Sequence, residues 1–390
     1  MKYNFDEITD RSASSGSFST KWNVLEGELP MWVADMDFKT APEIIEALQK
    51  RLENGVFGYT DIPPEWNKAI AAWWRNHHHF DMKEENLIFC TGVIPALSSI
   101  VRKLTSPAEK VLIQTPVYNI FYNSILNNGR TVVENPLLYD DKNHTYSINW
   151  QDLEEKLSDP QVSLMILCNP QNPTGNIWKK EELDKIGQLC SKYGVTVVSD
   201  EIHCDITAPD AEYIPFASVS KLNASISVTC IAASKAFNIA GLQSAAVYVE
   251  NNFLRHKVWR GLNTDEVAEP NAFAIQATIA AFNQGEEWLS QLRTYLAENR
   301  KKAEVFIAEK LPKLHPVPSK ATYLLWLDCS EITDNSRELA KNLREKTGLY
   351  VSAGWVYGEG GMSFLRINLA TQQSRLQQGL ERLYKGLKDF

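Results

Sequence analysis

Short apolar runs alternate with longer amphipathic stretches through most of the chain, and this alternation constrains the fold more than any other feature. Seven runs have the length and residue types of buried strands, at residues 86–90, 110–116, 131–137, 163–170, 194–201, 225–234 and 244–250. Helical stretches such as 180–194 lie between several of them. Strands separated by helices form parallel sheets with helices on their faces. The sequence therefore predicts an α/β fold with a mostly parallel, seven-stranded sheet flanked by helices.

The two ends of the chain have a different pattern. Residues 41–55 and 65–78 are expected to be helices, and the first of these starts at a proline and stops at a glycine. A long helical stretch after residue 285 leads into a strand-like run at 321–330 and a final helix. A chain of 390 residues exceeds the usual size of one hydrophobic core. We therefore expect an N-terminal arm at 1–45 that joins a smaller α+β domain at 286–390, and a large domain at 46–285.

Composition and charge limit the possible partners. The chain is 44% hydrophobic and 23% charged, which is typical of a globular protein with a large core. Its net charge of -8 argues against nucleic acid and anionic membranes, because both are bound through basic surfaces. The N-terminal residues lack the apolar segment of a secretion signal, and no window approaches the length of a membrane span. We expect a cytoplasmic protein that binds small molecules or proteins.

Cysteine and histidine positions give no sign of a metal site or a disulfide framework. The six cysteines are scattered without a C-x-x-C pair, and several lie in strand-like runs, so we interpret them as reduced core residues. Three consecutive histidines occupy residues 77–79. Consecutive side chains on a helix point in different directions and cannot converge on one ion. We therefore expect a solvated helix end there and no metal.

Polar residues follow several of the predicted strands at the positions where ligands bind in open parallel sheets. Asp200 ends one strand, Asn172 and Tyr118 lie in the loops after two others, and Lys235 follows a fourth. Gly92 lies at a strand-to-helix turn, where backbone N–H groups can face an anion such as a phosphate. Each residue alone has a structural alternative, as a turn residue, a helix cap or a core aromatic. Their joint occurrence at strand ends favours a binding site.

Lys235 lies in the run IAASKAFNIAGL, which otherwise consists mainly of small and apolar residues. An ammonium group removed from water is costly unless it is paired or loses its proton. A lysine in such a run is therefore either exposed at a strand end, or it is buried with a paired charge or a lowered pKa.

Several motifs in combination resemble a known family. NPQNPTG, SDEIH and SKAFNIAGLQ resemble the fold-type I pyridoxal-phosphate enzymes of the class I/II aminotransferase superfamily, with 28 residues from Asn172 to Asp200 and 35 from Asp200 to Lys235. Within that superfamily, MWVADMDF, GVFGYT, PVYNIFY and DEIHCD resemble the MalY/PatB branch of cystathionine β-lyases, also called C–S lyases. The resemblance extends from about residue 30 to the end of the chain.

The resemblance implies a role for each residue in binding pyridoxal 5′-phosphate. Lys235 would form a Schiff base with the cofactor aldehyde, and Asp200 would keep the ring nitrogen protonated. Asn172 would donate to the ring O3′, and Tyr118 would stack on the ring face. Lys235, Asp200 and Tyr118 are the expected catalytic residues. The expected phosphate contacts are Gly92, Val93, Ile94 and Ser234.

The resemblance also implies a substrate site and a dimer. Arg366, in a strand-like run, matches the family arginine for the substrate α-carboxylate, which its planar fork would bind in a bidentate manner. Asn172 is expected to contact the substrate too. Tyr323 and Trp355 are candidates for lining the pocket, with core packing as the alternative. Tyr59 is expected to reach the phosphate in the neighbouring subunit, which makes the active unit a homodimer.

Three positions depart from the usual pattern of the superfamily. Gln243 stands where an arginine commonly pairs with the phosphate, and Ala232 stands where a serine often contributes. His203 replaces a tyrosine that often bonds the ring O3′. Phosphate binding would therefore depend on the helix N-terminus, Ser234 and Tyr59, and His203 is expected to contact the cofactor.

The branch resemblance implies a PLP-dependent C–S β-lyase. Such an enzyme would perform α,β-elimination on cystathionine, cysteine or S-substituted cysteines and release pyruvate, ammonia, and either a thiol such as homocysteine or hydrogen sulfide. Two alternatives remain open from the sequence. One is a PLP-dependent aminotransferase, which would return the proton to the cofactor and need a keto acid to turn over. The other is a regulatory binding protein with a secondary PLP site.

Overall fold

The structure is a computed structural model that describes residues 2–388, and its largest element is a seven-stranded sheet. The strand order across this sheet is β2 (Leu87–Cys90), β10 (Ala245–Tyr248), β9 (Ser227–Ile231), β8 (Thr196–Asp200), β7 (Val162–Cys168), β3 (Lys110–Thr115) and β4 (Thr131–Pro136). β10 is antiparallel to both of its neighbours, and the other pairings are parallel. All seven predicted strands and the α/β fold class are confirmed.

Helices cover both faces of this sheet because its strands are apolar on both sides. Alternate residues of a strand point to opposite faces. Val198 of β8 belongs to a core cluster with residues of α3 (Val93–Leu104), α4 (Ile120–Leu126) and α8 (Asn252–Thr264). Its neighbour Val197 belongs to a cluster with residues of α5 (Trp150–Leu157) and α6 (Lys180–Lys192). The short helix α7 (Lys221–Ile226) packs beside α6.

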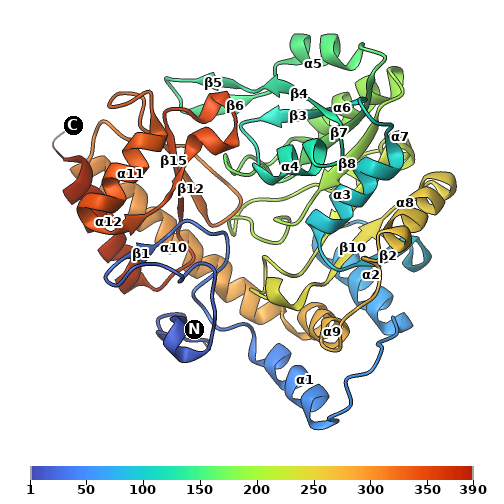
Figure 1. The fold of residues 1–390 in the computed structure, drawn as a ribbon, viewed down its shortest axis with the longest axis horizontal. Coiled ribbons are helices and arrows are strands. Elements are labelled where there is room, and N and C mark those ends of the chain that lie inside the picture. Colours follow the sequence, from blue (N-terminus) through green and yellow to red (C-terminus); the bar gives the residue numbers. More distant parts are fainter. Residues whose placement is uncertain (1, 389–390) are drawn as a thin grey trace.

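The C-terminal part forms a second, antiparallel sheet in the order β11 (His315–Pro316), β12 (Leu324–Asp328), β15 (Phe364–Asn368) and β14 (Ser352–Ala353). The helices α11 (Ser336–Thr347) and α12 (Gln373–Leu387) pack on each other beside it. In the N-terminal arm, β1 (Leu29–Pro30) pairs in parallel with β13 (Leu349–Tyr350). The N-terminal arm therefore lies against the C-terminal elements, as Figure 1 shows in blue and red. The exact domain limits stay a prediction.

Further helices and one hairpin lie outside these two sheets. α1 (Pro42–Glu53) and α2 (Pro64–His78) pack against α9 (Ala274–Gln284), and β5 (Leu138–Asp140) forms a hairpin with β6 (Thr145–Ser147). The longest helix, α10 (Glu286–Lys310), leads into the C-terminal part. Within residues 2–388, no helix combines the length and the apolar character that crossing a membrane requires. The cytoplasmic location stays a prediction.

The structure confirms one expectation about side chains and corrects another. All six cysteines are free and buried, as predicted. The histidines at the end of α2 were expected to be solvated, and for two of them this is wrong. His78 points inward and its Nε2 lies 2.8 Å from Asp205 Oδ1, while the ring centroid of His77 lies 3.8 Å from that of Trp73. Asp205 lies 127 positions from His78, so helix periodicity could not indicate this contact. Trp73 lies one turn before His77 on the same helix, and its ring packs against the imidazole.

The turn after β7 carries Asn172 and is fixed against the segment before β12. Its Gly175 has a φ of +72°, which side-chain-bearing residues rarely adopt. The Gly175 carbonyl accepts hydrogen bonds from the Lys320 and Ala321 N–H groups, at 3.3 and 3.2 Å. A Cβ atom at Gly175 would lie 1.8 Å from Ser319 Oγ and 2.8 Å from the Ala321 carbonyl oxygen. The backbone oxygen cannot move aside as a side chain can, so this turn requires glycine.

We therefore predict that Gly175→Ala lowers the free energy of unfolding by about 2–4 kcal/mol, as expected when backbone strain and a steric clash combine. Gly194→Ala is the matched control, because Gly194 has a φ of +70° but no atom within 4 Å of its would-be Cβ. The control should cost only about 1–2 kcal/mol. Urea unfolding midpoints followed by circular dichroism measure both. Equal midpoints for the two variants would contradict a packing role for this turn.

Candidate active site

Two cavities meet at Lys235. The smaller has a volume of about 270 Å³ and lies at the carboxyl ends of β8 and β9 and the N-terminus of α3. The larger has a volume of about 1160 Å³ and lies between the N-terminal arm and the C-terminal part. Ala34, Tyr118 and Lys235 line both cavities. The side chain of Lys235 therefore lies where a molecule bound in one cavity can contact a group bound in the other.

Asp200 provides a buried carboxylate in the smaller cavity. It ends β8, is 4% exposed, and its Oδ1 accepts a hydrogen bond from the Ile202 N–H at 3.1 Å. Burial raises the pKa of this carboxyl to about 7, while the Ile202 N–H and the charge of Lys235 act in the opposite direction. A carboxylate held in this way gains stability from a cationic or N–H donor that enters the cavity.

His203 and Asn172 lie beside Asp200 and come from two different strand ends. His203 is buried, and its Nδ1 has no hydrogen-bond partner among the described residues. Burial lowers the pKa of His203 to about 3, and the charges of Lys235 and Arg366 lower it further, so this imidazole is neutral. Asn172 is also buried and its Oδ1 accepts from Arg366 Nη1 at 3.1 Å. Asn172 therefore links the smaller cavity to the arginine of the larger one.

Lys235 lies in the loop after β9, and its Nζ donates to the Ala34 carbonyl at 2.7 Å. Burial lowers the pKa of Lys235 to about 8, and the charge of Arg366 acts in the same direction. Asp35 and Asp200 partly oppose this shift. An amine with a pKa near neutrality is available as a nucleophile and as a base.

The other end of the smaller cavity can hold an anion. Gly92 is the N-cap of α3, and no side chain in the described part of the chain caps this helix. The first N–H groups of the helix therefore face the cavity, where Val93 and Ile94 line the wall. Ser234 also lines this cavity. Gln243 lines it as well, whereas Ala232 is buried and is not among its lining residues. The predicted phosphate residues therefore surround one space, with no arginine among its described lining residues.

Arg366 lies on β15 and lines the larger cavity. It is 5% exposed, and its Nη2 donates to the Trp32 carbonyl at 2.9 Å. Its Nε is buried without a partner among the described residues. The guanidinium lies 4.9 Å from the ring centroid of Tyr357. A buried guanidinium with an unused donor, beside the lysine, is suited to binding a carboxylate.

Tyr118 forms the wall where the two cavities join. It is packed edge-on against Phe121 at a centroid distance of 5.9 Å, and burial raises the pKa of its hydroxyl. Its position fits the predicted stacking role.

Three other predicted site residues are not among those that line either cavity. Tyr323 is buried, and its hydroxyl donates to the Ala34 carbonyl at 3.0 Å. Trp355 is 42% exposed, with the Arg337 guanidinium 5.2 Å from its ring centroid. Tyr59 is fully exposed in the loop between α1 and α2. Their roles in binding stay predictions.

Reasoning from the sequence missed the contribution of residues 32–37. The Trp32 carbonyl accepts a hydrogen bond from Arg366, and the Ala34 carbonyl accepts hydrogen bonds from both Lys235 and Tyr323. These are backbone groups outside helices and strands, and side-chain chemistry could not indicate them. The only signal was the motif MWVADMDF, which carried the family resemblance but no role.

Comparison with known proteins agrees with this geometry. The model of the family described as aminotransferase class I and II matches residues 29–383. Cystathionine β-lyase PatB of Bacillus subtilis (strain 168) is 42% identical over 390 residues, which cover 98% of this chain and 100% of PatB. Protein MalY of Escherichia coli (strain K12) is 34% identical over 398 residues, which cover 99% of each chain.

A solved structure supports the same assignment. Cystalysin from Treponema denticola, whose crystal structure contains a pyridoxal 5′-phosphate cofactor, is similar with a TM-score of 0.95 and 32% identity over the whole of both chains. The match thus extends over the elements that form both sheets. The chain belongs to the aminotransferase class I and II family and, within it, to the branch that contains PatB and MalY.

Proposed function

We propose that this protein is a PLP-dependent C–S β-lyase that acts on cystathionine and related S-substituted cysteines. The observation that carries this proposal is the position of Lys235 between a cavity with a buried carboxylate, Asp200, and a cleft with a buried guanidinium, Arg366. The similarity to cystathionine β-lyase PatB over nearly the whole chain supports the same function.

The residues of the smaller cavity fit pyridoxal phosphate. Asp200 is buried, and none of the described residues gives it a cationic partner in hydrogen-bond contact, which suits a protonated pyridine nitrogen. The unpartnered Nδ1 of His203 is available to a polar ring substituent. The uncapped N-terminus of α3, with Ser234, suits the phosphate. The bound cofactor withdraws electrons from the Cα of an attached amino acid.

Each surrounding side chain would then have a separate role in an elimination reaction. Arg366 would bind the α-carboxylate and orient the Cα–H bond toward Lys235. Lys235 would remove the Cα proton, which its lowered pKa favours. Asp200 would hold the proton on the ring nitrogen. Loss of a thiolate from Cβ would complete the elimination. Water would then hydrolyse the remaining aminoacrylate to pyruvate and ammonia.

The charged residues of the larger cavity favour a thioether substrate whose far end is zwitterionic. The cavity is lined by residues of both charges, namely Glu26, Glu28, Lys341, Arg344 and Glu345. Arg344 is already bound to Glu28 through two contacts of 2.7 Å, so it does not form an isolated carboxylate site. Cystathionine carries both an ammonium and a carboxylate at its far end. A dicarboxylic amino acid such as aspartate carries only a second negative charge there.

This proposal predicts pyruvate and thiol release from cystathionine or cysteine without any added keto acid. The purified, cofactor-loaded protein is incubated with each substrate, and pyruvate is measured with a coupled assay. Aspartate with a keto acid serves as the comparison reaction. Efficient aspartate transamination together with negligible pyruvate from cystathionine would support the aminotransferase alternative and contradict the lyase.

Arg366→Lys should reduce kcat/KM for cystathionine by about 10²-fold, mainly through KM, because a single ammonium cannot replace the bidentate fork. Arg75→Lys is the matched control, since Arg75 pairs with Asp81 and is not among the residues that line either cavity. The control should retain activity. Steady-state kinetics with cystathionine measure both variants, and an unchanged KM in Arg366→Lys would remove this residue from the carboxylate site.

We further propose that the active unit is a homodimer in which Tyr59 reaches the phosphate bound in the other subunit. The loop that carries Tyr59 presents three exposed apolar side chains: Val56 is 69% exposed, Phe57 52% and Tyr59 103%. Exposed apolar side chains grouped in this way are typical of surfaces that another chain covers. The absence of an arginine at Gln243 leaves the phosphate in need of a further donor.

Tyr59→Phe should therefore weaken cofactor binding by about tenfold, because a hydrogen bond to a charged phosphate contributes about 1.5 kcal/mol or more. Tyr384→Phe, at a partly exposed position on α12, is the control and should bind the cofactor normally. Cofactor affinity is measured by equilibrium dialysis and the mass in solution by light scattering. A monomeric active enzyme would exclude the shared site.

A further inference from the structure

The segment from Trp32 to Asp37 crosses the junction of the two cavities without regular secondary structure. Its backbone carbonyls accept hydrogen bonds from the two cationic side chains of the proposed site. The Trp32 carbonyl accepts from Arg366 Nη2 at 2.9 Å, and the Ala34 carbonyl accepts from Lys235 Nζ at 2.7 Å. Because no ladder of strand hydrogen bonds fixes this segment, its position depends on side chains that hold it from behind.

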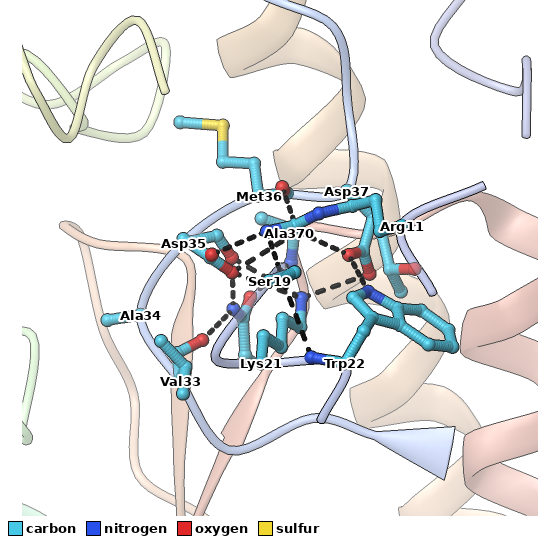
Figure 2. Close-up of polar contacts among 12 residues, drawn as sticks. Arg11, Ser19, Lys21, Trp22, Val33, Ala34, Asp35, Met36, Asp37 and Ala370 are labelled. Carbon is cyan, nitrogen blue, oxygen red and sulfur yellow. Dashed lines mark hydrogen bonds and ion pairs between the residues drawn. The ribbon is translucent and has the colours of Figure 1, made fainter. Parts of the chain in front are cut away.

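A cluster of charged side chains from the N-terminal arm holds the segment on that side (Figure 2). Arg11 contacts both carboxylates, with Nη2 2.7 Å from Asp35 Oδ2 and Nη1 2.9 Å from Asp37 Oδ1. Lys21 Nζ lies 3.0 Å from Asp37 Oδ2 and 3.8 Å from Asp35 Oδ1. The Trp22 indole N–H donates to Asp37 at 2.8 Å. Two cations and two carboxylates therefore share one network.

Burial makes this network a geometric constraint. The side chains of Lys21 and Asp37 are each 1% exposed. Removing one partner from a buried ion pair leaves an uncompensated charge, which is strongly destabilising. The network therefore favours one arrangement of the Asp35 and Asp37 side chains. The Asn368 side-chain amide donates to the Val33 and Asp35 carbonyls and holds the backbone on either side of Ala34.

Asp35 differs from Asp37 in ways that connect it to the chemistry. It directly follows Ala34, its side chain is 24% exposed, and its charge acts on Lys235. Asp37 is fully enclosed by Arg11, Lys21 and Trp22. The other charged or titratable groups near Lys235 are Asp200, Arg366, His203, Tyr323 and Tyr118. Asp35 is the carboxylate of the N-terminal arm whose charge acts on Lys235.

We propose that Asp35 is a positioning residue for Lys235. Held by Arg11 and Lys21, it keeps the Ala34 carbonyl where it accepts from the lysine ammonium, so Lys235 occupies one defined position whenever it is not bonded to the cofactor. That position lies at the junction of the two cavities, within reach of the substrate. The proposal rests on the proposed role of Lys235 as the catalytic amine.

The test measures the amine of Lys235 directly in the full-length chain after removal of the cofactor. Acetic anhydride is pulsed at a series of pH values, and acetylation of the Lys235 peptide is quantified by mass spectrometry. Asp35→Asn removes the negative charge that opposes the lowering of the Lys235 pKa. The labelling curve should therefore shift to lower pH by about half a unit to one unit, a change of about three- to tenfold in the neutral fraction at fixed pH.

Glu7→Gln is the matched control, because it makes the same charge change in the same arm and removes the exposed Lys39–Glu7 pair, which does not contact residues 32–37. This control should leave the labelling curve unchanged. In the cofactor-loaded enzyme, Asp35→Asn should lower kcat for pyruvate release more than it changes KM.

Identical labelling curves for the wild type, Asp35→Asn and Glu7→Gln would overturn the proposal. Asp35→Ser replaces Asp35→Asn if circular dichroism shows that the latter does not fold. The labelling result does not depend on turnover, so it stands even if the substrate proves not to be a thioether. Failure of pyruvate release in the wild type would instead count against the proposed function alone.

Discussion

The site depends on the cost of keeping an acid and an amine out of water at the ends of adjacent strands. β8 and β9 are parallel neighbours, so Asp200 and the loop with Lys235 emerge at the same edge of the sheet. The hydrogen-bond donor to Asp200 is the Ile202 N–H, and the acceptor from Lys235 is the Ala34 carbonyl. Burial brings the two pKa values to about 7 and about 8, so neither charge is strongly fixed. A cofactor with a cationic ring and an aldehyde satisfies both groups at once.

Much of this arrangement could be predicted from the sequence, because it follows from local patterns. Each strand is a short apolar run, and parallel strands place their carboxyl ends at one edge. Asp200, Asn172, Tyr118 and Lys235 therefore converge, as predicted, and all four line the smaller cavity. Arg366 required the family resemblance, since a lone arginine in a strand-like run has no local signal that separates a buried site residue from a surface one.

The remaining parts could not be predicted because they depend on contacts between distant segments. Ala34 and Lys235 are 201 positions apart, and their contact uses a backbone oxygen that every residue has. The network of Arg11, Lys21, Asp35 and Asp37 lies in an arm without periodicity, where charged residues usually indicate a solvated surface. His78 shows the same limitation, since its partner Asp205 is 127 positions away.

The central claim is that Lys235 is the residue that bonds the cofactor, and it can be tested chemically. The purified protein is incubated with pyridoxal phosphate, reduced with borohydride, digested, and analysed by peptide mass spectrometry. We predict that the added cofactor mass is found on the peptide that contains Lys235, and that no cofactor is fixed in Lys235→Ala. Fixation on a different lysine, or equal fixation in the variant, would contradict the account.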